Sequence, residues 1–203
     1  MLSPLFSSHK RMTQLVLAST SPFRRELLSR LQIPFVTVAP DADESPLPNE
    51  PPPATAERLA VAKAEAVAAN FPMALIIGSD QVAYCGEQRF GKPGTRHNAA
   101  SQLQSMRGKD VIFHTGLCLL NTATGRKQVA GIENIVGFRD LRDDEIEAYL
   151  DKEDALNCAG AAKSEGLGIS LLRYLRGDDP NALVGLPLIA LSAMLRNEGV
   201  PLP

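Results

Sequence analysis

Residues 15–25 read LVLASTSPFRR, and this stretch decides the fold of the N-terminal half. Its first four residues are an apolar run of buried-strand type, and the following Leu27 and Leu31 are one helical turn apart. Between the two patterns, Ser21 is a good N-cap and Pro22 suits the first position of a helix. The stretch therefore predicts a strand, a tight turn and a helix that begins at Pro22.

Outward from this unit, strand patterns and helix patterns alternate along the chain. The expected strands are 33–39, 74–78, 111–120, 132–138 and a pair that ends at 175, with a hairpin over 82–90. The expected helices are 56–70, 95–106, 143–150 and 188–197, and a Pro-rich acidic loop is expected at 40–53. Strands interleaved with helices indicate an α/β fold, a layered α/β/α domain around a mixed β-sheet.

A length of 203 residues fits a single domain, or one domain split into two lobes with a cleft between them. We assign residues 13–198 to that domain and residues 1–12 to a loose N-terminal leader. The leader lacks the early positive charge and the apolar stretch of a secretory signal, and Met1 or Met12 is the true start.

Charge and composition narrow the classes of partner. The chain has 21 Lys and Arg residues against 23 Asp and Glu residues, so no global positive field draws in nucleic acid. No apolar run approaches the roughly 18 residues of a membrane span. Three cysteines without a C-x-x-C fit neither a disulfide framework nor a zinc site, and they favour a reducing cytosol.

Two adjacent arginines, Arg24 and Arg25, fall in the first turn of the predicted helix. Cations are unfavourable at a helix N-terminus unless something negative is bound there, whereas its free N–H groups attract anions. The mismatch points to a bound phosphate near Ser21 and Arg24. The alternative is a plain N-cap with solvated arginines.

Asp80 follows directly after the apolar run 74–78. Open α/β sheets bind ligands beyond the carboxyl ends of their strands, and a carboxylate there can hold a divalent cation or deprotonate a water. The alternative is a loop Asp that caps a turn. Asp43 and Glu44 at the rim of the acidic loop are further metal-ligand candidates, although alone they resemble solvated loop charges.

Residues 86–93, GEQRFGKP, match most of a phosphate-binding P-loop. The motif needs Ser or Thr where this chain has Pro93, and Pro disfavours helical geometry at Lys92, where the helix of a P-loop begins. We therefore reject the motif and retain Lys92 as a lone cation in a rigid turn.

Seven short motifs in order along the chain resemble the Maf family of nucleotide pyrophosphatases. They are LASTSPFRR at 17–25, DE at 43–44, AKA at 62–64, IGSDQ at 77–81, GKP at 91–93, CAG at 158–160 and LVGLP at 183–187. The resemblance spans about residues 13–198. It implies a Maf/ITPase-like fold, hydrolysis of a nucleoside triphosphate to the monophosphate and pyrophosphate in the cytoplasm, a divalent metal such as Mg or Mn, and a possible homodimer.

By position, the resemblance implies a role for each matching residue. Asp80 matches the proton acceptor of the family, and the residues that match its phosphate-handling positions are Ser21, Arg24, Lys63 and Lys92. Glu44 is favoured over Asp43 for the additional carboxylate, so Glu44 and Asp80 are the metal-ligand candidates.

Phe23, Gln81 and Glu165 stand where branches of the family differ, and they resemble the branch that cleaves 7-methyl-GTP. That branch commonly has Trp at the first position, and Phe23 departs from it, which favours weaker base selectivity. A guanine methylated at N7 is cationic, so an aromatic face attracts it more than an arginine does. Glu165 can accept hydrogen bonds from guanine N1–H and the exocyclic amine.

The less favoured alternatives for these positions are a core contact beside Leu27 for Phe23 and a solvated loop acid for Glu165. The competing functions are a dTTP/UTP pyrophosphatase of the same family and a non-catalytic module that senses nucleotides.

Overall fold

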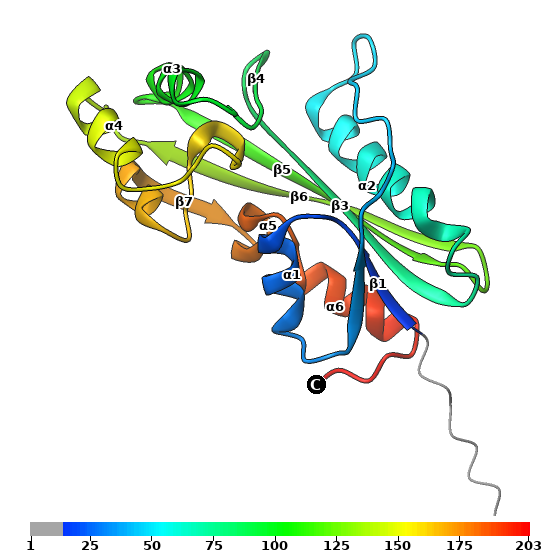
Figure 1. The fold of residues 1–203 in the computed structure, drawn as a ribbon. Helices are drawn as coiled ribbons and strands as arrows, with labels where there is room; N and C mark the ends of the chain where they lie inside the picture. The colour runs from blue at the N-terminus through cyan, green and yellow to red at the C-terminus, as the bar shows by residue number, and fades with distance from the viewer. Residues whose placement is uncertain (1–13) are drawn as a thin grey trace, which may run out of the picture.

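The structure, a computed structural model, describes residues 14–203, so the leader assigned to 1–12 and the choice of start lie outside the described residues. Its seven-stranded sheet has the order β2-β1-β3-β5-β6-β7, with β4 paired to β3 (Figure 1). The strands are β1 (Gln14–Ala18), β2 (Phe35–Val38), β3 (Ala74–Cys85), β4 (Gln88–Phe90), β5 (Asp110–Asn121), β6 (Arg126–Phe138) and β7 (Leu172–Gly177).

Helices and short 3-10 turns complete the fold. They are α1 (Pro22–Ser29), α2 (Pro52–Ala68), α3 (Arg96–Met106), α4 (Asp143–Leu150), η1 (Ala159–Ala161), η2 (Leu167–Leu171), α5 (Pro180–Val184) and α6 (Leu188–Asn197). β1 pairs in parallel with β2 and β3, and the other neighbours pair antiparallel. The predicted α/β fold with a mixed sheet is confirmed.

β1 lies between β2 and β3, and its alternate residues face opposite sides of the sheet. Leu15 and Leu17 pack in the core formed with α1 and α6, whereas Val16 and Ala18 pack in the core formed with α2. The helices accordingly cover opposite faces (Figure 1). The connections that leave the adjacent parallel strands β1 and β2, through α1 and α2, go to opposite faces, and such a change of face opens a crevice beyond the carboxyl ends of the strands.

Two glycines let α2 approach the sheet closely. A Cβ at Gly78 of β3 would lie 2.0 Å from the carbonyl oxygen of Ala60, and a Cβ at Gly116 of β5 would lie 2.3 Å from that of Ala56. Backbone atoms cannot swing aside as flexible side chains do, so only glycine fits at either position. This contact holds α2 against β3 beside the crevice.

A second core occupies the far end of the sheet. There β3, β5 and β6 extend past α2 and pack with α3, α4 and η1 around buried side chains that include Phe113, Phe138 and Tyr149 (Figure 1). The two lobes are thus the two ends of one sheet, each with its own core.

The strand predicted at 74–78 is shorter than the observed β3, which runs to Cys85, so the prediction that Asp80 follows the strand is wrong. β3 continues to Cys85 because its pairing with β5 runs unbroken from Leu75 to Tyr84. Asp80 therefore lies inside a strand. Pairing with the parallel neighbour β1 stops at Ile77, however, so Asp80 still lies beyond the carboxyl end of the parallel pair.

Other boundaries also differ from prediction. α2 begins at Pro52 rather than 56, because prolines are compatible with a first helical turn. β6 begins at Arg126 rather than 132, since it pairs with β5 as far as Asn121. The strand pair expected to end at 175 is wrong: residues 167–171 form η2, and only β7 is a strand there.

Within residues 14–203, no helix has both the length and the apolar character needed to cross a bilayer. The three cysteines are free thiols.

Candidate active site

A cavity of about 840 Å³ lies between the two ends of the sheet. One wall comes from the turn after β1, the start of α1, the loop after β2 and α2, and the other comes from β4 and the segment 157–165. The residues that line the cavity include Ser21, Phe23, Arg24, Glu44, Lys63, Asp80, Gln81, Lys92 and Glu165, whereas the other two candidates, Arg25 and Asp43, are not among them.

The start of α1 has the predicted cap. Ser21 Oγ accepts a hydrogen bond from the Arg24 N–H at 3.3 Å, and Ser19 Oγ accepts one from the Ser21 N–H at 3.1 Å. Pro22 occupies the first helical position. The turn after β1 therefore delivers the positive end of a helix to the cavity.

The Arg24 side chain uses only part of its hydrogen-bonding capacity within residues 14–203. Its Nε donates to the carbonyl oxygen of Gly185 at 2.8 Å, and its two Nη atoms have no partner among residues 14–203. Burial lowers the pKa of Arg24, while the negative charges of Asp80 and Glu44 raise it. A half-buried guanidinium with unused donors beside a helix N-terminus suits an anion that accepts two bonds at once.

Lys63 joins two carboxylates from different elements. Its Nζ lies 2.6 Å from Asp80 Oδ1 and 3.0 Å from Glu44 Oε2. The side chains of Lys63 and Asp80 are 7% and 12% exposed, whereas that of Glu44 is 59% exposed. Buried charges persist only when they are paired, so the ammonium and the Asp80 carboxylate depend on each other.

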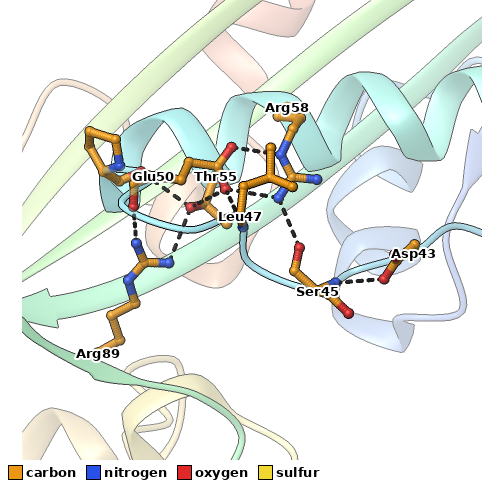
Figure 2. A network of polar contacts seen from close by, with 8 residues as sticks. Asp43, Ser45, Leu47, Glu50, Thr55, Arg58 and Arg89 are labelled. Carbon is orange, nitrogen blue, oxygen red and sulfur yellow. Dashed lines mark hydrogen bonds and ion pairs between the residues drawn. The ribbon is translucent and has the colours of Figure 1, made fainter.

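The loop that carries Glu44 is tied down by a polar network (Figure 2). Glu50 accepts hydrogen bonds from Arg58 Nε and Nη2 at 2.6 and 2.8 Å and from Thr55 Oγ1 at 2.8 Å. Arg58 also donates to the carbonyl oxygen of Ser45 at 3.1 Å, and Arg89 of β4 donates to the Glu50 carbonyl oxygen. Loop, α2 and β4 are thus joined next to Glu44.

We expect this network to make stability depend on pH. The bonds from Arg58, then those from Thr55 and the Leu47 N–H, lower the pKa of Glu50 from 4.5 to about 2. A carboxyl whose pKa is depressed on folding stabilises fully above its unfolded pKa and loses this effect as the pH falls through the folded value. Glu50→Gln should lower Tm at pH 7. The difference in Tm between this variant and the wild type should shrink as the pH falls from 4.5 to about 2.

Thermal unfolding at several pH values measures this gap. Glu26→Gln is the matched control, because in the part of the chain that the structure describes the Glu26 carboxylate pairs only with Arg30, in an exposed i,i+4 contact. A gap for Glu50→Gln that stays constant from pH 7 to 2 would contradict the assigned ion pair.

The donor set near Lys63 fits a divalent metal only together with a ligand. No group of three or more His, Cys, Asp or Glu residues within 14–203 is arranged around a metal position. Mg²⁺ is commonly bound by one or two carboxylates plus substrate phosphates and waters. Glu44 and Asp80, which converge on one ammonium, match that requirement.

The residues selected for base recognition line the cavity in different ways. Phe23 is half-buried and lies outside the three apolar cores, and Glu165 is exposed, with only Ser164 Oγ 3.5 Å from its carboxylate. Gln81 Nε2 instead donates to Thr115 Oγ1 and to the carbonyl oxygens of Ala182 and Leu183. Its amide nitrogen therefore holds α5 in place, which leaves its oxygen for a ligand.

Lys92 lies exposed at the cavity, between β4 and α3. Because α3 begins at Arg96, Lys92 does not open a helix, and the rejection of the P-loop is confirmed.

Two further cations line the cavity that sequence reasoning missed, Arg89 and Lys163. Lys163 stands two residues before Glu165 in the same Gly-studded segment, and this closeness in the sequence is the signal that could have revealed it. Arg89 gave no signal beyond its place in the predicted hairpin.

The chain matches the family model described as "Maf-like protein" over residues 14–198. Among curated relatives, the 7-methyl-GTP pyrophosphatase of Aromatoleum aromaticum is 61% identical over 95% of this chain and 100% of that protein. The 7-methyl-GTP pyrophosphatase of Cupriavidus metallidurans is 57% identical over 92% of this chain and 94% of that protein.

Among solved structures, the Staphylococcus aureus Ham1 protein aligns with a TM-score of 0.47 at 14% identity, over 63% of this chain and 73% of that chain. That likeness is too distant to support an inference. The family model and the relatives each span more than nine-tenths of this sequence, and together they show that the chain belongs to the Maf family.

Proposed function

We propose that this protein hydrolyses 7-methyl-GTP to 7-methyl-GMP and pyrophosphate. The observation that carries the proposal is one cavity with two kinds of lining. It holds the buried ion pair of Asp80 and Lys63, and it also holds the aromatic ring of Phe23 and the exposed carboxylate of Glu165. The first set suits a triphosphate and the second suits a cationic purine. The names of the relatives at 61% and 57% identity support the same substrate.

Cations and helix N–H groups bind the triphosphate in this mechanism. Arg24 offers two unused Nη donors, Lys63 and Lys92 offer ammonium groups, and Ser21 caps a helix whose dipole favours negative charge. Such preorganised charges stabilise the negative charge that develops during the reaction. The triphosphate is thereby oriented toward Asp80.

Asp80 acts as the general base. Its Oδ1 contacts Lys63, and its Oδ2 has no hydrogen-bond partner among residues 14–203, so Oδ2 is available to accept a proton. As the oxygen of a water forms a bond to the α-phosphorus, its proton passes to Oδ2, and the bond from that phosphorus to the α,β-bridging oxygen breaks, so that pyrophosphate leaves. A divalent metal held by Glu44 and Asp80 would neutralise phosphate charge when bound.

Phe23 and Glu165 select the base. The ring of Phe23 offers its negative face to the positively charged 7-methylguanine, and the Glu165 carboxylate accepts from its N1–H and exocyclic amine. Thymine and uracil lack that pair of donors, which disfavours the dTTP/UTP alternative. The three cysteines without a disulfide framework favour the cytoplasm as the compartment.

A substrate panel tests the proposal. Pyrophosphate release is measured with 7-methyl-GTP, GTP, dTTP and UTP, each with Mg²⁺, Mn²⁺ or EDTA. We expect the highest kcat/KM for 7-methyl-GTP and loss of turnover in EDTA. A preference for dTTP and UTP would assign the other branch, and tight binding without product would indicate a sensing module.

A further inference from the structure

The carboxylate of Glu153 binds the segment that carries Glu165 at two points. Glu153 Oε1 lies 2.6 Å from Lys163 Nζ, and Glu153 Oε2 accepts a hydrogen bond from the Leu167 N–H at 2.8 Å. These two contacts fall on either side of Glu165. We call residues 162–167 the Glu165 loop.

The backbone of the Glu165 loop also lies close to this carboxylate. A Cβ at Gly166 would lie 2.4 Å from Glu153 Oε2, so the backbone of the Glu165 loop approaches the carboxylate closely. The pKa of Glu153 is lowered first by the bond from Lys163 and then by the bond from the Leu167 N–H. Glu153 therefore remains ionised at neutral pH and keeps its hydrogen bonds to Lys163 and to the Leu167 N–H.

A tyrosine fixes the start of the same loop. Tyr149 Oη accepts a hydrogen bond from the Lys163 N–H and donates one to the Ala161 carbonyl oxygen, each at 3.1 Å. Burial raises the pKa of Tyr149 to about 12, which keeps the hydroxyl neutral and able to play both parts. Tyr149 and Glu153 together define the path of the backbone through Glu165.

Neither anchor lines the substrate cavity. Glu153 lines a separate hollow of about 390 Å³ with Arg96 and Lys152, whereas Lys163 and Glu165 line the larger cavity. The hydrogen bonds of the Glu153 side chain to Lys163 and Leu167 connect it to the larger cavity through the Glu165 loop.

We propose that Glu153 is a positioning residue for base selectivity, which holds the Glu165 carboxylate at the place where it meets the base. The inference rests on the proposed function, because it concerns the same site. Among residues 14–203, the Glu165 carboxylate has only the contact with Ser164 Oγ, so its position follows that of its backbone. A group that must meet two donors at once loses most of its value when it shifts by about 1 Å.

The test compares Glu153→Gln with Glu147→Gln. Glutamine keeps the shape but has one acceptor oxygen, so it cannot serve both Lys163 and the Leu167 N–H with charge. Glu147 pairs with Arg96, which lines the same hollow, and Glu147→Gln removes the same charge without touching the loop. For each variant and the wild type, kcat and KM are measured for 7-methyl-GTP and UTP, alone and combined with Glu165→Gln.

We expect Glu153→Gln to lower the kcat/KM ratio of 7-methyl-GTP over UTP by about 10-fold, through KM, as a displaced positioning group does. Glu147→Gln should leave the ratio unchanged. Glu153→Gln should add little to Glu165→Gln, because both remove the same contact. If Glu153→Gln does not fold, Tyr149→Phe decides, with a change in the same direction expected.

The inference is overturned if Glu153→Gln behaves like Glu147→Gln, if it lowers kcat equally for both substrates, or if its effect multiplies with that of Glu165→Gln. An unchanged ratio in Tyr149→Phe, where that variant decides, also overturns it. A wild type that does not prefer 7-methyl-GTP overturns the proposed function and the inference with it. If the wild type does prefer 7-methyl-GTP, the proposed substrate stands and the variants test the role of Glu153 alone.

Discussion

Replacing Asp80 by Asn should lower kcat by about 10²–10⁴, the range expected when a general base is removed. Asn has the shape of Asp but cannot accept the proton of an attacking water at neutral pH. The change also leaves Lys63 with Glu44 as its carboxylate partner. We therefore expect some loss of stability as well, and the assay must be run well below the Tm of the variant.

Asp43→Asn is the matched control for this experiment. Asp43 is exposed, lies in the loop beside Glu44, and accepts a hydrogen bond from the Ser45 N–H. Its replacement should leave kcat close to the wild-type value. A folded Asp80→Asn variant with near-normal turnover would remove Asp80 from the mechanism.

Replacing Phe23 by Ala should weaken binding of the base by about 1–3 kcal/mol, the typical value of one stacked base. Each 1.4 kcal/mol is about tenfold, so KM for 7-methyl-GTP should rise by roughly 5- to 150-fold. Phe23 lies at the cavity and outside the apolar cores, so the change should cost little stability.

Phe23→Trp is the informative companion variant, because a larger aromatic face attracts a cationic ring more strongly. It should lower KM for 7-methyl-GTP relative to GTP. A reduced Tm in Phe23→Ala together with an unchanged KM would instead assign Phe23 to packing beside Leu27.

Local signals predicted the start of the fold well. The cap at Ser21 and the first helical position of Pro22 depend on neighbouring residues only, so the sequence pattern contains all the physics involved. The end of β3 was predicted wrongly for the opposite reason. Its extension past Asp80 depends on pairing with β5, about thirty residues away in the sequence.

The site could be predicted as a set of residues but not as a set of contacts. Asp80 and Lys63 were selected separately, and their ion pair arises because Gly78 allows α2 close to the sheet. No sequence pattern pointed to Glu153, because its role depends on the hydrogen bonds that the Lys163 side chain and the Leu167 N–H donate to its carboxylate in the folded protein. Contacts of this kind depend on tertiary packing, which residue patterns do not encode locally.

The most direct test is a crystal structure with Mg²⁺ and a 7-methyl-GTP analogue whose α,β-bridging oxygen is replaced by a methylene group. The account expects the α,β-linkage beside Asp80 and Lys63, the phosphates on the Arg24 guanidinium, and the purine on Phe23 with Glu165 at its N1 edge. A triphosphate bound away from Asp80, or a base that faces solvent away from Phe23, would contradict it.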